Sequence, residues 1–288
     1  MSPMEQNPAH SVEALVRAGV RLLEGRSDSP RLDTEVLLAH ALGWSRAALY
    51  ARRGDALPAE ASARCLALIH ARQSGRPVAQ IVGEREFWSL PLLVTADVLT
   101  PRPETELLVE RALSRIPVSA GVRVLDLGTG SGAIAIALAT ERPAATVQAT
   151  DRSEAALVIA RRNAERHVLT RVGFSCGDWF AATSGRFDVI VSNPPYIGET
   201  EWPTLGPELS FEPRTALTAG PEGLDALRQI VAGAPDFLVP GGWLLLEHGA
   251  GQARAVQSLL QAHGFTQVTT AVDLAGHPRV TEGCLTVA

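Results

Sequence analysis

Apolar residues in the first quarter of the chain recur at the three- and four-residue spacing of an amphipathic helix. Val12, Leu15 and Val16 open the first such pattern, and Ser11 stands before them as a suitable N-cap. Further patterns of this kind start at residues 33, 45 and 58. Residues 1–75 therefore predict a small all-helical domain, and residues 1–10 predict a loose tail in front of it.

The period of the pattern changes after residue 75. Residues 80–88 and 92–95 alternate like strands, and Ser89-Leu-Pro91 separates them, so residues 76–103 predict a β-hairpin linker. A helix over residues 107–113 is expected to follow.

Strand and helix patterns alternate regularly over the rest of the chain. Strands are expected at 122–127, 146–151, 172–175, 188–192, 242–247, 265–272 and 285–287, the last two as an antiparallel pair. Helices are expected at 133–139, 153–166 and 252–262. Residues 104–288 therefore predict one α/β domain, with a Rossmann-like open sheet of seven strands and helices on both faces.

Composition narrows the class of protein. The 288 residues carry a formal net charge of −5, whereas nucleic-acid binders usually show a basic balance or stripe. No apolar run is long enough to span a membrane, and no signal peptide is apparent, so a cytoplasmic protein is expected. Cys65, Cys176 and Cys284 are far apart, so neither a metal site nor a disulfide framework is expected.

A glycine-rich loop joins the strand at 122–127 to the next helix. It comprises Gly128, Thr129, Gly130, Ser131 and Gly132. Such a loop lets the backbone approach a ligand closely, and with Ala133 it also fits the relaxed dinucleotide pattern, so a nicotinamide dehydrogenase is an alternative at this point. Asp151, at the end of the next strand, would accept from ribose hydroxyls in either case.

Three further features favour a cofactor with a cationic amino group and a reactive methyl group, S-adenosylmethionine. Asp126 stands two residues before Gly128, where it would attract an ammonium group and repel a pyrophosphate. Asp178 and Trp179 offer a carboxylate for an adenine amine and an aromatic wall for its ring. The third feature, a polar tip, follows the strand at 188–192.

This tip is Asn193-Pro194-Pro195-Tyr196. The prolines stop the strand and stiffen the backbone, because neither can donate a ladder hydrogen bond. The side-chain oxygen of Asn193 and the carbonyl of Pro194 suit the two protons of a planar NH₂ group, and Tyr196 would stack on that group. Such a nitrogen is a poor nucleophile, so the tip predicts a strong electrophile opposite, which the sulfonium methyl of S-adenosylmethionine supplies.

Together these residues carry a family resemblance over nearly the whole chain. The landmarks are Glu86-Phe-Trp, Pro101-Arg-Pro-Glu-Thr-Glu106, Val124-Leu-Asp-Leu-Gly-Thr-Gly-Ser-Gly-Ala-Ile134, Ser192-Asn-Pro-Pro-Tyr-Ile197, Glu212-Pro-Arg-Thr-Ala-Leu217 and Glu247-His-Gly249. With them the chain resembles the protein-glutamine N5-methyltransferases that modify peptide chain release factors. Thr100 departs from the pattern, since the family more usually has an apolar residue there.

The resemblance implies a fold, a reaction and a site. The fold is a seven-stranded S-adenosylmethionine-dependent methyltransferase domain behind a helical substrate-recognition domain. The substrate is the Gly-Gly-Gln glutamine of bacterial release factors. Gly128 to Gly132, Asp151 and Trp179 bind the cofactor, together with Asn193, and residues 193–196 hold the glutamine amide.

Two alternatives remain open. One is an N-methyltransferase that acts on a ribosomal protein glutamine or on adenine in nucleic acid, and the acidic balance argues against nucleic acid. The other is a non-catalytic binding protein, which the complete set of cofactor and tip residues argues against. The segment 197–222 is expected to cover the substrate side, with Glu212-Pro213-Arg214 as a candidate contact, and His248 is expected to be structural.

Overall fold

A computed structural model describes residues 11–119 and 121–286. The chain divides into two compact units, Met1–Gly83 and Glu84–Ala288, and each is described by itself. The expected tail over residues 1–10 lies outside the described residues.

The first unit is helical. Its helices are α1 (Val12–Leu23), α2 (Pro30–Leu42), α3 (Arg46–Ala51), α4 (Ala59–Gln73) and α5 (Val78–Val82). The Ser11 hydroxyl accepts a hydrogen bond from the Ala14 amide at 3.2 Å, which confirms it as the N-cap of α1. Gly43, with φ of 66°, ends α2.

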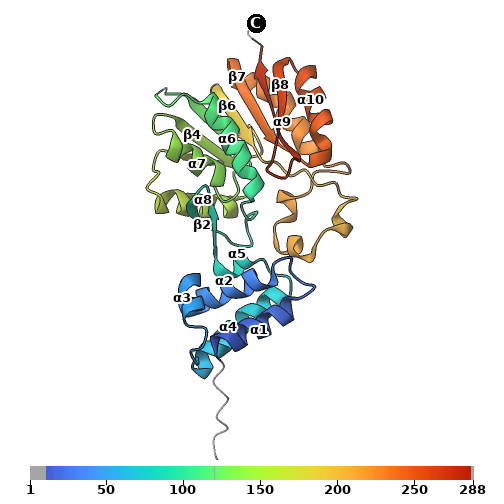
Figure 1. Ribbon diagram of the computed structural model, residues 1–288. Coiled ribbons are helices and arrows are strands. Elements are labelled where there is room, and N and C mark those ends of the chain that lie inside the picture. Colours follow the sequence, from blue (N-terminus) through green and yellow to red (C-terminus); the bar gives the residue numbers. More distant parts are fainter. Residues whose placement is uncertain (1–10, 120, 287–288) are drawn as a thin grey trace, which may run out of the picture. The chain divides into compact units, whose positions relative to one another are not determined.

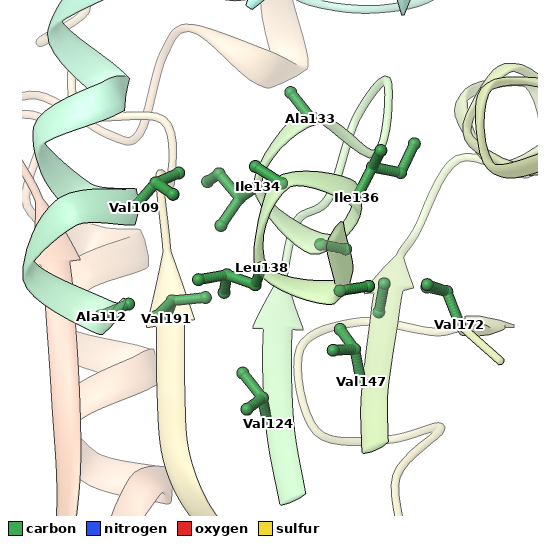
Figure 2. Packing of buried hydrophobic residues seen from close by; sticks show 14 of the residues in the cluster. Val109, Ala112, Val124, Ala133, Ile134, Ile136, Leu138, Val147, Val172 and Val191 are labelled. Carbon is green, nitrogen blue, oxygen red and sulfur yellow. The ribbon is translucent and has the colours of Figure 1, made fainter. Parts of the chain in front are cut away.

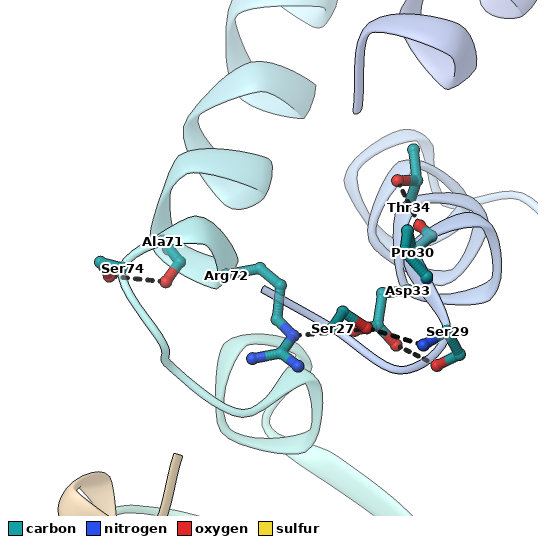
Figure 3. Close-up of polar contacts among 8 residues, drawn as sticks. All are labelled: Ser27, Ser29, Pro30, Asp33, Thr34, Ala71, Arg72 and Ser74. Carbon is teal, nitrogen blue, oxygen red and sulfur yellow. Dashed lines mark hydrogen bonds and ion pairs between the residues drawn. The ribbon is translucent and has the colours of Figure 1, made fainter. Parts of the chain in front are cut away.

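Close packing and one buried ion pair join the helices of this unit. A Cβ on Gly19 of α1 would lie 2.4 Å from Cγ2 of Thr34 in α2, so only glycine fits there. Figure 3 shows the polar contacts at the start of α2, where Asp33 accepts from Ser27 and from Arg72, the latter at 2.8 Å. Arg72 lies near the end of α4, so this pair links two helices distant in sequence.

The segment after residue 75 differs from the prediction. The expected strand from Gln80 is wrong, because Val78–Val82 is a helix that Pro77 opens and Gly83 ends at φ of 80°. The hairpin follows it as β1 (Glu84–Phe87) and β2 (Leu90–Leu93). Trp88 and Ser89 both have positive φ, as the tight two-residue turn requires.

The second unit is built on the expected seven-stranded sheet (Figure 1). Its strands are β3 (Arg123–Leu127), β4 (Thr146–Asp151), β5 (Gly173–Cys176), β6 (Phe187–Ser192), β7 (Leu238–Glu247), β8 (Phe265–Val272) and β9 (Pro278–Leu285). Their order is β5-β4-β3-β6-β7-β9-β8, and β9 runs antiparallel to both neighbours. The final strand was expected at 285–287, but it occupies 278–285, and Val287 lies outside the described residues.

Helices pack on both faces of this sheet because its central strands are apolar on both sides. On one face, α6 (Glu106–Arg115), α7 (Ala133–Glu141) and α8 (Glu154–Arg166) bury residues against Val124 and Val191. Figure 2 shows α7 lying over these valines. On the other face, α9 (Asp225–Phe237) and α10 (Ala253–Ala262) cover Leu125 and Ile190.

The strand order sets the position of the site. From β3 the chain proceeds outward to β4 and β5, and then returns to β6 on the other side of β3. The carboxyl ends of β3 and β6 therefore form the crevice at which open α/β sheets bind ligands.

Candidate active site

The glycine loop at the end of β3 is held by its neighbour strand. The amides of Gly128 and Thr129 both donate to the carbonyl of Thr150, at 2.8 and 2.9 Å. Gly128 and Gly130 have φ of 72° and 56°, which glycine adopts without strain. The loop therefore presents backbone in place of side chains to the space in front of it.

Asp151 lies at the end of β4 with its carboxylate oriented by two amides. Its two oxygens accept from Gly130 and Ser153, each at 2.9 Å. A carboxylate has further acceptor sites beyond these two, and Asp151 lines a cavity beside the loop.

Asp126 lies behind the loop and is fully buried. Burial raises the pKa of Asp126 to about 7, although the Thr129 hydroxyl donates to it at 2.6 Å. The other oxygen, Oδ1, has no hydrogen-bond partner among the described residues. Asp126 is not part of the cavity lining, so its assignment to the cofactor stays a prediction.

Asp178 and Trp179 follow β5 and line the same cavity. Trp179 has an unusual φ of 45°, and its indole nitrogen donates to Gln229 at 2.8 Å. A Cβ on Gly128 would lie 3.5 Å from this indole ring. The tryptophan therefore forms a fixed wall beside the glycine loop.

The other three residues of the glycine loop, Thr129, Ser131 and Gly132, do not line the cavity and pack against the rest of the domain. Thr129 and Ser131 are buried, and the Ser131 carbonyl accepts from Asn163 at 2.9 Å. Gly132 lies so close to α8 that a Cβ would be 3.2 Å from that of Ala160. Only Gly128 and Gly130 of the loop line the cavity itself.

The Asn193-Pro194-Pro195-Tyr196 tip leaves the carboxyl end of β6. The Asn193 side chain donates from Nδ2 to the Thr105 hydroxyl at 3.1 Å, which turns its oxygen away from Thr105. The Tyr196 hydroxyl donates to Glu247 at 3.4 Å, and the Tyr196 carbonyl accepts from Gln252 at 2.9 Å. Side chains from three other segments thus hold the tip.

Two cavities meet at this tip. The first contains Gly128, Gly130, Asp151, Asp178, Trp179 and Asn193. The second contains Arg102, Asn193, Pro194, Pro195 and Tyr196, with Leu99, Leu209 and Leu217 as apolar walls. Asn193 and Pro195 line both. Of the residues predicted for the cofactor, Gly128, Gly130, Asp151, Asp178 and Trp179 thus line the first cavity. Pro194 and Tyr196, predicted for the acceptor, line the second, and Asn193 and Pro195 lie between the two.

The segment 197–222 forms part of the lining of both cavities. It consists of short 3₁₀ turns, η2 (Trp202–Thr204), η3 (Pro207–Phe211) and η4 (Arg214–Ala216), and it contributes lining residues to each cavity. Glu212 lines neither one. It is buried, pairs with Arg102 at 2.6 Å and accepts from the Thr100 amide at 3.1 Å, so it anchors the segment. Pro213, next to it, does line the first cavity, so the candidate contact over Glu212-Pro213-Arg214 stays a prediction.

Sequence reasoning missed Glu247 and Thr105, which lie directly behind the tip. Glu247 is 1% exposed, and burial raises its pKa to about 7. A glutamate at the end of a predicted strand, followed by His248 and Gly249, does not by itself indicate that its side chain is buried beside the tip. His248 is buried and bonded to Thr281 at 2.7 Å, and burial lowers its pKa, which fits the structural role expected for it.

Within residues 11–119 and 121–286 no three His, Cys, Asp or Glu side chains form a cluster that could hold a metal ion. No helix in the described part of the chain is long and apolar enough to span a membrane.

Two family models match this chain. Residues 103–273 match the family model of the methyltransferase small domain, and residues 13–83 match that of the PrmC N-terminal domain. A methyltransferase from Pyrococcus furiosus shares the fold with a TM-score of 0.52 and 20% identity, over 77% of this chain and 98% of that one. The second unit is thus a Rossmann-like methyltransferase domain.

Curated relatives then define the family. A release factor glutamine methyltransferase of Burkholderia pseudomallei is 50% identical over 99% of both chains. One from Xylella fastidiosa strain 9a5c is 51% identical over 88% of this chain and 92% of its own length. The chain belongs to the release factor glutamine methyltransferase family.

Proposed function

We propose that this protein transfers the methyl group of S-adenosylmethionine to the side-chain amide nitrogen of the Gly-Gly-Gln glutamine in bacterial peptide chain release factors. The observation that carries this proposal is the meeting of two cavities at Asn193 and Pro195. A methyl donor in the first cavity and an amide in the second would both lie against Asn193 and Pro195.

The first cavity fits S-adenosylmethionine. Asp151 has free acceptor sites for ribose hydroxyls, and Asp178 and Trp179 offer a carboxylate and a ring face for adenine. The unpaired, buried Oδ1 of Asp126 suits the ammonium group of the methionine part. When bound, this cofactor supplies an electrophilic methyl group.

The second cavity fits a glutamine side chain. Leu99, Leu209 and Leu217 would enclose its methylene groups, and the Tyr196 ring would pack on its planar amide. The Asn193 oxygen and the Pro194 carbonyl would accept its two N–H groups. The neighbouring glycines of the substrate would let its loop enter a narrow pocket.

The chemistry of these residues is positioning and charge stabilisation. An amide nitrogen that gains a methyl group becomes positively charged, and its protons become more acidic. The two acceptor oxygens therefore bind it more tightly in the transition state than in the ground state, which lowers the barrier. Asn193 and Pro194 are neutral, so the released proton passes to water.

The helical first unit, residues 1–83, is assigned to recognition of the release factor, because the second unit already holds both cavities. Release factors act on ribosomes, so the reaction is placed in the cytoplasm. No nucleic acid contact is required in this scheme.

The test is methyl transfer from labelled S-adenosylmethionine to an unmodified release factor, beside a copy whose Gly-Gly-Gln glutamine is replaced by alanine. Label on the first protein and not on the second supports the proposal. Label on both, or on neither while the cofactor still binds, would move the acceptor to another group, such as a ribosomal protein glutamine or adenine.

A further inference from the structure

One glutamine side chain joins the amide-binding tip to the start of α10. This residue, Gln252, directly precedes the helix. Its Nε2 donates to the carbonyl of Tyr196 at 2.9 Å, and to those of Glu222 and Gly223 at 3.2 and 3.4 Å. The side chain therefore reaches from α10 to three carbonyl groups of other segments.

The partners of Gln252 fix the direction of its amide group. Carbonyl groups only accept hydrogen bonds, so the atom that faces the three carbonyls must be the nitrogen. On the other side the backbone amide of Gly249, which only donates, lies 2.9 Å from Oε1. A half-turn of the side-chain amide would leave all four groups facing an atom of the wrong kind. Gln252 is therefore held in one orientation.

The three carbonyls lie at the two ends of the segment 197–222. Tyr196 directly precedes this segment, Glu222 is its last residue, and Gly223 follows it. A Cβ on Gly223, whose φ is 71°, would lie 2.1 Å from the Tyr196 carbonyl oxygen, so the two ends meet where only glycine fits. Gln252 thus binds the tip and the end of the segment with one NH₂ group.

Backbone hydrogen bonds also join these two ends. The amide of Ile197 donates to the Leu217 carbonyl at 2.9 Å, and the amide of Ala219 donates to the Ile197 carbonyl at 3.0 Å. These bonds hold the ends to each other and not to the helices that cover the sheet. The side chain of Gln252 adds a link to α10, which packs on one face of the sheet.

The tip and the segment together line the second cavity, the one proposed for the acceptor amide. Tyr196 belongs to this lining, and so do Leu209, Ala216 and Leu217 of the segment. The Tyr196 ring also lies close to Gly249, where a Cβ would be 3.7 Å from its Cδ2. A shift of the Tyr196 carbonyl would therefore move the ring that is expected to pack on the glutamine amide.

We propose that Gln252 is a positioning residue for the acceptor amide, because it ties Tyr196 and the end of the segment 197–222 to α10. This inference rests on the proposed function, and it names a residue outside both cavities on which the shape of the second cavity depends. Neither Gln252 nor Tyr196 lines the first cavity. Loss of the link should therefore impair use of the release factor far more than binding of S-adenosylmethionine.

Two variants at Gln252 and one control test the proposal by steady-state kinetics. Gln252→Glu keeps an acceptor for the Gly249 amide but turns an oxygen to the three carbonyls, so kcat/KM for the release factor should fall roughly 10²-fold. Gln252→Met loses both kinds of bond without this repulsion, and its kcat/KM should fall roughly tenfold. Gln257→Met, in the same helix, removes a similar bond, from Nε2 to Thr270 at 2.8 Å, and should keep wild-type activity.

The pattern across these variants separates positioning from a general loss of structure. Wild-type kcat/KM in Gln252→Glu would mean that only the bond to Gly249 matters, and it would overturn the inference. An equal loss in Gln252→Met and Gln257→Met would overturn it too, because any change in α10 would then have the same effect. The Kd for S-adenosylmethionine, measured by calorimetry, should change much less than kcat/KM, and an equal change in both would also contradict the inference.

A second measurement does not depend on catalysis. The backbone amides of Ile197 and Ala219 should exchange with solvent faster in Gln252→Glu than in the wild type, because the paired ends open more readily without their link to α10. Gln257→Met should leave their exchange unchanged. Unchanged exchange in Gln252→Glu would contradict the inference even if methyl transfer to release factors is observed. Faster exchange in a protein that shows no such transfer would support the link and reject only the proposed substrate.

Discussion

Two carboxylates near the glycine loop have different environments, and we propose a different role in cofactor binding for each. Asp151 lines the cavity and is bonded to two backbone amides, whereas Asp126 is fully buried with one unpaired oxygen. A hydroxyl-rich ribose suits the first, and a cation suits the second, because a positive charge would satisfy the oxygen that the protein leaves without a partner.

Cofactor binding should therefore depend on pH through Asp126. Because the pKa of Asp126 is about 7, its carboxyl group is protonated below that pH and must lose this proton before it can pair with an ammonium group. The Kd for S-adenosylmethionine should rise by up to about tenfold per pH unit below 7 and level off above it. Calorimetry in buffers of different ionisation enthalpy would detect the released proton.

Asp126→Asn is the control for this prediction. It keeps the side-chain shape and removes the ionisation, so its Kd should be weaker and nearly constant over the same pH range. A wild-type Kd that is equally constant would contradict the assignment of Asp126 to the ammonium group.

At the scale of elements, the segment 197–222 is anchored by one buried ion pair to the stretch that precedes α6. Glu212 has a fully buried side chain, while Arg102 is 38% exposed and also lines the acceptor cavity. The bond to the Thr100 amide adds a second link. Removing the carboxylate leaves this amide and the arginine without their partner.

Glu212→Ala should therefore loosen the segment. We expect a loss of about 1–3 kcal/mol in the local opening free energy, seen as faster amide hydrogen exchange within 197–222. The KM for the release factor should rise more than the Kd for S-adenosylmethionine. Glu199→Ala, at an exposed glutamate of the same segment, is the comparison variant. Equal exchange rates in the two variants would show that Glu212 is not the anchor.

The elements also show how far the sequence alone leads. The parallel strands and the glycine loop could be predicted because their apolar runs and turn residues are local signals. Helix α9 was missed, since Gly233 and Pro235 near its end argue against a helix locally. Residues 80–82 were assigned to the predicted strand 80–88, because isoleucine and valine fit either state. Pro77 and Gly83 flank the helix that these residues form instead.

The same reasoning explains the site. That Asp151, Trp179 and Asn193 lie around one cavity could be predicted, because the carboxyl ends of parallel strands share one edge of the sheet. The contacts of Thr105 with Asn193 and of Glu247 with Tyr196 could not be predicted, because they join segments that come together only in the fold. The buried partners of Glu212, Arg102 and the Thr100 amide, lie about 110 residues earlier in the chain and could not be predicted from the sequence.

At the scale of the whole molecule, the second unit holds two buried carboxyl groups with raised pKa values. Asp126 and Glu247 both have a pKa of about 7 in the fold, well above their usual values of 3.8 and 4.5. At a pH between the usual pKa values and about 7, both groups are protonated in the folded protein but largely ionised in the unfolded chain. The free energy of unfolding should therefore decrease as the pH rises from about 4.5 to about 7.

Each group contributes on the order of 3 kcal/mol to this decrease. Urea unfolding of the second unit within the full chain, at about pH 5.5 and about pH 7.5, would measure it. The double variant Asp126→Asn, Glu247→Gln should lose less stability over this range than the wild type. A parallel pH dependence in the two proteins would mean that neither group is buried in its neutral form.

The central claim is that Asn193 holds a glutamine amide between two cavities, and one measurement tests it most directly. Release factor is incubated with S-adenosylmethionine and either wild-type protein or Asn193→Ala, and the peptide with the Gly-Gly-Gln sequence is examined by mass spectrometry. We predict one added methyl group on that glutamine with the wild type and a rate roughly 10²- to 10³-fold lower with the variant, while both still bind the cofactor. Full turnover by Asn193→Ala, or methylation of a different residue, would contradict the account.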